Sequence, residues 1–133
     1  MAIPLQSLSG TEVLRRGCVN AQTSAATQLK FNNVVPTAPG NSTDGDVPAN
    51  HIITVLSVLF CEQGNQSDEL IHMYIEGLHG SGIYLLRNHS IGPYQTFIYA
   101  DTFALMGGDS LRIQTQASAN IDIWYNYIDQ SWV

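Results

Sequence analysis

SLRIQTQA (residues 110–117) and IDIWYNYI (residues 121–128) decide the fold of this chain. In each run apolar and polar side chains alternate, so every second residue lies on the same face, as in a strand with one buried face. Residues 118–120 (Ser-Ala-Asn) are short and polar, which predicts a turn between the two strands. We therefore expect a hairpin at the end of a β-sandwich.

The chain from His51 onward reads as a series of short strands separated by turns rich in Gly, Pro and Asn. Strands are predicted at residues 52–61, 70–78, 83–86 and 96–105. The first of these is apolar on both faces, as expected for a central strand that is covered on both sides. Short strands at such intervals are typical of a sandwich or a barrel. The sequence predicts an all-β fold, an antiparallel β-sandwich of the jelly-roll-like kind.

The front of the chain has a different character. Residues 1–26 contain one apolar cluster followed by small polar residues, and Gly17 would end a helix begun at Thr11 after barely one turn. We expect an extended N-terminal arm over 1–26, with at most that helical turn, and a sandwich domain over 27–133. Residues 36–50 are loop chemistry throughout, so this long loop is a candidate contact loop.

The composition is unusually poor in charge. Only 12% of the 133 residues are charged, against roughly 25% in average soluble domains. A surface with so few charges predicts that neighbouring chains cover much of it, the alternative being a small extracellular or low-charge monomer. The net charge of -6 argues against nucleic-acid binding, because phosphate contacts need clustered Lys and Arg and only Arg15-Arg16 forms a basic pair.

The sequence predicts neither secretion nor insertion into a membrane. The first residues lack the basic and the sustained apolar regions of a signal peptide, and no run approaches the roughly 20 apolar residues of a membrane-spanning helix. We expect no membrane partner. Cys18 and Cys61 are the only cysteines, and without a secretion signal they are expected to be free, buried and unpaired.

The chain carries no recognisable catalytic or metal-binding motif. The four histidines have no ligand spacing, and residues 41–46 (Asn-Ser-Thr-Asp-Gly-Asp) lack the alternating acids of a calcium loop. Asp109 follows two glycines and is expected to bind the amides of a turn. We therefore expect no enzyme activity, no cofactor and no metal.

Trp124 is out of phase with Tyr125 and Tyr127, so one of these sets points away from the core. An outward Trp124 can contact another protein, pack beneath the N-terminal arm of its own subunit, or stack on a sugar. Trp132 is hard to explain in a free monomer, because chain ends fray unless they dock. The candidate protein-contact residues are Ile3, Leu5, Leu8, Val13, Leu14, Arg15, Arg16, Trp124, Tyr127 and Trp132.

From Ile52 to Ile128 the chain resembles small virion proteins of tailed bacteriophages. The resemblance rests on six short stretches: Leu59-Phe60-Cys61, Tyr84-Leu85-Leu86, Ile91-Gly92-Pro93, Asp101 to Leu105, Gly108 to Ile113, and the final strand Ile121 to Tyr127. Residues 1–50 lie outside it.

That resemblance implies a capsid decoration (cement) protein or, alternatively, a tail, baseplate or fibre component. It implies a jelly-roll-like sandwich that is often trimeric, without cofactors or catalysis, bound to the major capsid protein or other virion proteins on the capsid exterior. A second alternative is a carbohydrate-binding attachment module, in which Trp124 would stack on a sugar.

Overall fold

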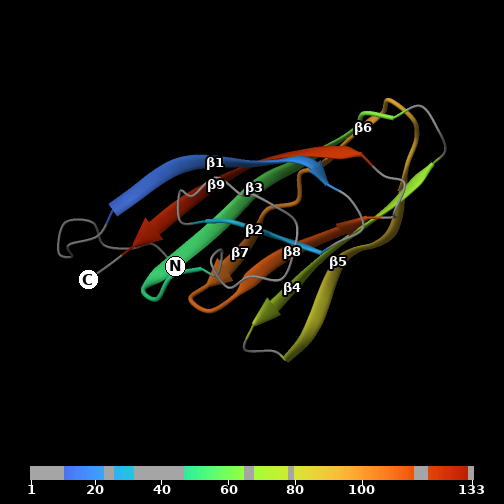
Figure 1. Cartoon of the computed structure of the whole chain (residues 1–133). Coiled ribbons are helices and arrows are strands. Elements are labelled where there is room, and N and C mark those ends of the chain that lie inside the picture. Colours follow the sequence, from blue (N-terminus) through green and yellow to red (C-terminus); the bar gives the residue numbers. More distant parts are fainter. Residues whose placement is uncertain are drawn as a thin grey trace.

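The described residues form nine strands in two antiparallel sheets (Figure 1). The structure is a computed structural model that describes residues 11–22, 26–31, 47–64, 68–77, 80–115 and 120–131. No helix occurs in these ranges, and so none that could cross a membrane. The strands are β1 (Thr11–Gln22), β2 (Thr27–Leu29), β3 (His51–Glu62), β4 (Glu69–Gly77), β5 (Gly80–Ile91), β6 (Thr96–Tyr99), β7 (Phe103–Met106), β8 (Ser110–Thr115) and β9 (Ile121–Ser131).

The two sheets pack face to face as a sandwich. One has the order β1-β9-β3-β6, with β7 also paired to β3, and the other has the order β2-β8-β4-β5. Successive strands change sheet repeatedly, as between β3 and β4, β5 and β6, and β7 and β8. The predicted fold class, an antiparallel, jelly-roll-like β-sandwich, is confirmed.

The predicted hairpin between the last two strands is wrong, because β8 and β9 belong to different sheets. The alternation in each strand is confirmed: Leu111 and Ile113 are buried from one sheet, and Ile121 and Ile123 from the other. Alternation fixes which face of a strand is buried, but not which strand lies beside it. Here the two apolar faces meet across the core instead of lying side by side.

A β-bulge interrupts β3, which was predicted over 52–61 as a central strand that is apolar on both faces. The register against β9 shifts between Val55 and Ser57. As a result Val55 and Val58 both face the core, although their spacing is three residues. The predicted strand 96–105 is also two strands, β6 and β7, which both pair with β3 and are joined by a connection that contains Asp101.

The described part of the predicted N-terminal arm is built into the sandwich. β1 is extended, as expected, but the helical turn is not formed, and the strand pairs with β9 from Thr11 opposite Ser131 to Gln22 opposite Ile121. Gly17 lies opposite Tyr125, and a Cβ atom on Gly17 would overlap the ring of Tyr125. Residues 1–10, and all of the predicted loop except 47–50, lie outside the described residues.

Three aromatic rings fill the centre of the core. Phe31 makes edge contacts with Tyr125 and Tyr127, with ring centroids 5.6 and 4.9 Å apart. The Tyr125 hydroxyl donates a hydrogen bond to the carbonyl oxygen of Lys30 (2.7 Å) and accepts one from the Lys30 amide (2.9 Å). Burial raises the pKa of Tyr125 far above its usual range. This tyrosine therefore ties the segment after β2 to the middle of β9.

The turn between β7 and β8 is held by Asp109, as the sequence predicted. Its carboxylate accepts a hydrogen bond from the Met106 amide at 2.9 Å. Gly108 in this turn has φ of 91°, a conformation that favours glycine. Val47 joins the turn through backbone hydrogen bonds to Gly108 and Asp109.

Candidate docking surface

The five-stranded sheet has an outward side that is largely apolar. The strand register places its outward residues in rows that run across the sheet. The first row is Cys18, Trp124, Leu59 and Ile98, and the second, which is polar, is Arg16, Asn126 and Ser57. The third is Leu14, Ile128, Thr54 and Ala104, and the fourth is Glu12, Gln130, Ile52 and Met106. We call this side of β1, β9, β3, β6 and β7 the outer face.

Four large apolar side chains of the outer face are well exposed. Leu14 is 70% exposed, Met106 59%, Ile98 55% and Trp124 43%. They come from four different strands, so they are spread over the face. Isolated apolar side chains on a surface are ordinary, but several on one sheet face mark an interaction site. The outer face is therefore the first candidate for a functional surface.

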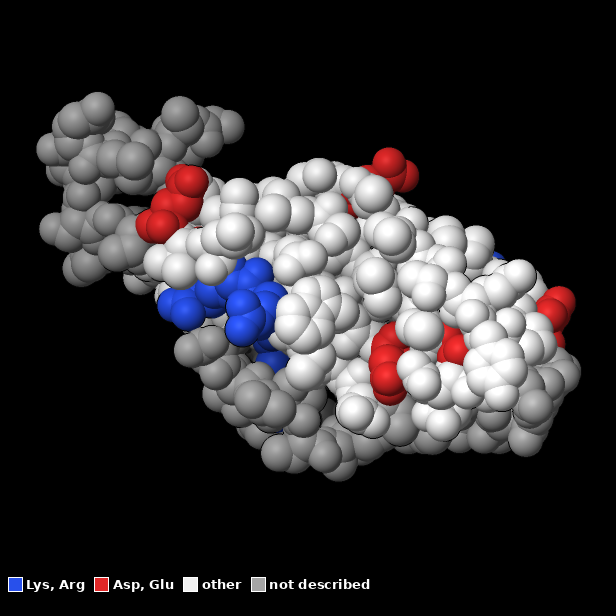
Figure 2. Space-filling view, turned by 90° about the horizontal axis from the view of Figure 1, so that it is seen from above, with Lys and Arg blue, Asp and Glu red and all other residues white. Residues whose placement is uncertain are grey.

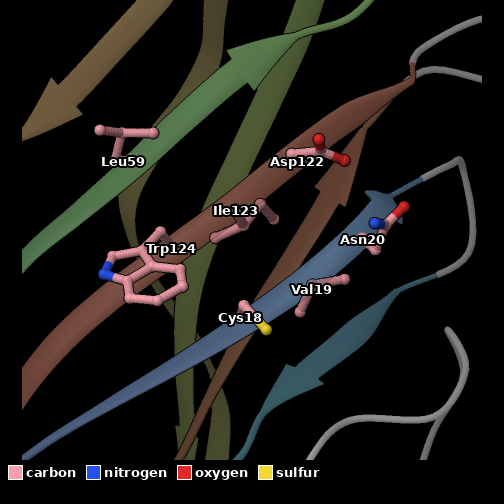
Figure 3. A pocket seen from close by; sticks show the side chains of 7 residues that line it. All are labelled: Cys18, Val19, Asn20, Leu59, Asp122, Ile123 and Trp124. Carbon is pink, nitrogen blue, oxygen red and sulfur yellow. The ribbon is translucent and has the colours of Figure 1, made fainter.

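A groove of about 250 Å³ lies beside Trp124 (Figure 3). Cys18 of β1 and Leu59 of β3 flank the indole ring, and Asn20 and Asp122 lie at the other end of the groove. This groove can hold a side chain of a partner protein or a small polar ligand that stacks on the indole.

A second hollow, of about 380 Å³, lies further along β1 and is basic. Leu14, Arg15, Arg16 and Asn126 line it. The Arg16 guanidinium carbon lies 5.7 Å from the centre of the Trp124 ring, within cation–π range. Figure 2, seen from the side of β1, β9 and β3, shows one compact basic cluster beside a broad uncharged area. This hollow suits a carboxylate.

Asp129 anchors the same end of the sheet from the inner side. Its Oδ1 lies 2.6 Å from Nδ1 of His51, and its Oδ2 lies 3.4 Å from Nε of Arg15. The three residues come from β9, β3 and β1, so the contacts join all three strands. Arg15 is thereby held where the basic hollow begins.

The predicted contact residues differ in how exposed they are in the structure. Val13, Leu14 and Arg16 are exposed, Arg15 is partly exposed, and Trp124 is outward. Tyr127 is wrong as a contact residue, because it is fully buried and packs against Phe31. Ile3, Leu5, Leu8 and Trp132 lie outside the described residues.

Sequence reasoning missed Ile98, Met106 and Leu59. Their outward position results from pairing with β3 and β9, and the bulge in β3 hides it from a simple reading of alternation. Cys18 and Cys61 are free, as predicted, but Cys18 is exposed and Cys61 is only partly buried.

The described histidines and acids make other contacts. His51 binds Asp129, His72 Nδ1 accepts a hydrogen bond from the Asn88 amide at 3.3 Å, and the ring of His89 lies 3.9 Å from that of Phe97. Among the described residues no group of three or more His, Cys, Asp or Glu side chains is placed to hold a metal ion.

Comparisons with known proteins support the fold of this chain and not its function. Neither family models nor curated proteins match the chain. The solved structure of murine APRIL superposes with a TM-score of 0.50 at 19% identity, over 89% of this chain and 98% of that one. A protein of the Bacillus endospore appendages, a family of disulfide-linked pili, gives a TM-score of 0.44 at 14% identity, over 94% and 91% of the two chains.

A pentameric capsid protein from metagenomic phage sequences gives a TM-score of 0.36 at 12% identity, covering 98% of this chain and 68% of that one. The TM-scores of the appendage and capsid proteins are too low to support an argument about function. The likeness to murine APRIL supports the sandwich fold and nothing beyond it.

Proposed function

We propose that this chain is a structural protein of a tailed-phage virion, a capsid decoration (cement) protein that binds the assembled shell through protein contacts. The observation that supports the proposal most is the outer face, on which Leu14, Ile98 and Met106 are more than half exposed around a largely uncharged surface. Such a face is poorly suited to a protein that stays alone in solution. The resemblance of residues 52–128 to small tailed-phage virion proteins is the reason for proposing a phage virion as the particle.

The proposed partner is the major capsid protein or another virion protein, and the proposed location is the capsid exterior. A ligand that binds only the assembled shell stabilises it by linkage, because shell disassembly must then also release the ligand. No catalytic step and no cofactor belongs to this role. A trimer is the proposed oligomer, as the resemblance implies.

Electron microscopy of virions made without this protein tests the proposal. We expect density to be missing from the outside of the shell, and the particles to lose infectivity at a lower temperature than the wild type. Particles complemented with the Ile83→Ser protein serve as the control, because Ile83 is an exposed apolar residue of β5 in the other sheet. Unaltered shell density together with unchanged heat resistance would contradict the proposal.

A tail, baseplate or fibre component is the alternative within the same class. The two roles differ in copy number, since a cement protein is present in hundreds of copies and a tail part in a few. Quantitative mass spectrometry of purified particles, scaled to the major capsid protein, separates them.

The Trp124 groove supports a second candidate function, a carbohydrate-binding attachment module. Asn20 and Asp122 place an amide and a carboxylate at the end of the groove away from the indole, and these groups bind sugar hydroxyls while the ring stacks on the sugar face. Glycan-array binding that is lost in Trp124→Ala and kept in Tyr94→Ala, an exposed aromatic elsewhere, would favour it. An array without any binding would argue against it.

A further inference from the structure

The outer face carries opposite charges at its two edges, at the same level along the strands. Arg16 lies on β1 at one edge, in the row that continues through Asn126 to Ser57. Asp101 lies at the other edge, between Tyr99, which is opposite Val58, and Phe103, which is opposite Val55. Arg16 and Asp101 are both exposed.

We propose that a second copy of this chain docks on the outer face, with Arg16 in the basic hollow of one copy facing Asp101 of the other. This inference rests on the proposed function in one respect, namely that the outer face is a protein-binding surface. It adds that the protein which covers the outer face is another copy of this chain. A surface that carries both members of a charge pair at opposite edges is complementary to itself, either about a two-fold axis or head to tail in a closed ring.

The size of the outer face fits a stable contact between copies. β9 has 11 residues, which at about 3.3 Å per residue span about 36 Å. Four strands side by side at about 4.8 Å cover about 19 Å, so the flat face measures about 700 Å². Standard interfaces bury about 800 Å² per partner. The side chains that project from the sheet add to this flat area and bring the outer face close to about 800 Å².

Asp101 is the carboxylate that fits the hollow best. Glu12, an exposed acid of the outer face, already accepts a hydrogen bond from Gln130 Nε2 at 2.9 Å. Asp122 lies beside the Trp124 groove and is only partly exposed. Asp101 is exposed in the connection between β6 and β7, at the edge of the sheet that the described residues form, where a neighbouring copy can reach it. Arg16, held against Trp124, is then buried between the copies together with the indole.

The native mass of the purified chain, measured by sedimentation equilibrium, tests the inference. We expect a dimer or a closed ring for the wild type. Arg16→Glu and Asp101→Arg should each raise the dissociation constant about tenfold or more, because each places like charges together. The double variant, with both substitutions, should return to within about threefold of the wild type. Ile98→Ser should also weaken association, through loss of apolar contact.

Matched controls separate the face from general effects of charge or polarity. Arg87→Glu on β5 and Asp68→Arg before β4 make the same changes of charge at exposed sites away from the outer face, and Ile83→Ser matches Ile98→Ser. All three should leave the dissociation constant unchanged. Circular dichroism of each variant verifies that it folds.

A monomeric wild type at about 100 µM, a concentration well above the Kd of most specific contacts, or a double variant no tighter than the single ones, overturns the second-copy inference. Shell binding, measured by co-sedimentation with assembled capsids, then decides whether the outer face binds the shell protein instead. If Arg16→Glu and Ile98→Ser lose shell binding while the mass is monomeric throughout, the face belongs to the shell protein and the proposed function stands. If these variants change neither mass nor shell binding, the proposed role of the face fails as well.

Discussion

Gly17 and Tyr125 form the tightest residue-level constraint in the five-stranded sheet. Gly17 has no side chain, and the Tyr125 ring occupies the space that a Cβ atom would need. Gly17→Ala should therefore destabilise the fold by about 1 to 3 kcal/mol, the usual cost of overpacking a core. Urea unfolding followed by tryptophan fluorescence measures this. Cys18→Ala, the next residue and outward, should change the unfolding free energy by less than about 0.5 kcal/mol.

The Tyr125 hydroxyl gives a second prediction. Tyr125→Phe removes both hydrogen bonds to the backbone of Lys30 in a buried site, so we expect a loss of about 1 to 3 kcal/mol. Tyr94→Phe, at an exposed ring, is the control and should be close to neutral. Equal unfolding midpoints for the two variants would show that the buried bonds contribute nothing.

Tyr125 also predicts a dependence on alkaline pH. Its pKa is raised by burial, so the folded state holds this proton more tightly than the unfolded state. Its contribution to stability is complete below about pH 10, the ordinary tyrosine pKa, and is lost as the pH rises beyond it. Urea midpoints between about pH 8 and pH 11.5 should fall more steeply for the wild type than for Tyr125→Phe. Parallel curves would refute this prediction.

At the scale of residues, the alternation of apolar and polar residues predicted which side chains of β9 are buried and which point outward for most of the strand. Residues Ile121, Ile123 and Tyr125 are buried and Trp124 is outward, as their phase requires. Tyr127 shares the phase of Tyr125, and it was misassigned because a tyrosine hydroxyl is compatible with either a core or a surface. Asp129 also shares that phase, and its burial depends on Arg15 and His51, which no local pattern brings near it.

At the scale of elements, Asp129 joins three strands, β9, β3 and β1. Asp129→Asn keeps the shape but removes the charge that faces Arg15 and His51. We expect a loss of about 1 to 3 kcal/mol, since hydrogen bonds to charged groups are the stronger ones. Hydrogen exchange should speed up first in the amides of β1 near Arg15, because β9 is the one strand paired with β1 in the described part of the chain. Asp68→Asn, at an exposed site, should leave exchange unchanged.

Strand pairing was the part of the fold that the sequence could not provide. The short polar segment before Ile121 suggested a hairpin, yet its flanking strands lie in opposite sheets. The bulge after Val55 likewise results from pairing with β9 and leaves no local mark in an apolar run. The outer face is assembled from β1, β9, β3, β6 and β7, so its extent became visible only with the register.

At the scale of the whole molecule, the sandwich is held by its core, without a covalent link between its two cysteines. Cys18 and Cys61 are free. A reducing agent should therefore leave the thermal midpoint unchanged to within about 1 °C, and Cys18→Ser with Cys61→Ala should unfold as cooperatively as the wild type. Calorimetry with and without dithiothreitol measures this. A clear drop on reduction would mean that a disulfide forms in the purified protein.

The antiparallel pairing of β1 with β9 has a mechanical consequence. Thr11 and Ser131 lie opposite each other at one end of the ladder. Tension applied through these two points would act along the hydrogen bonds and peel the strands apart one bond after another, like a zipper, instead of loading all the bonds at once. In the proposed shell-bound role, force spread across the broad side of this sheet would therefore be resisted better than force carried along the backbone to the start of β1 and the end of β9.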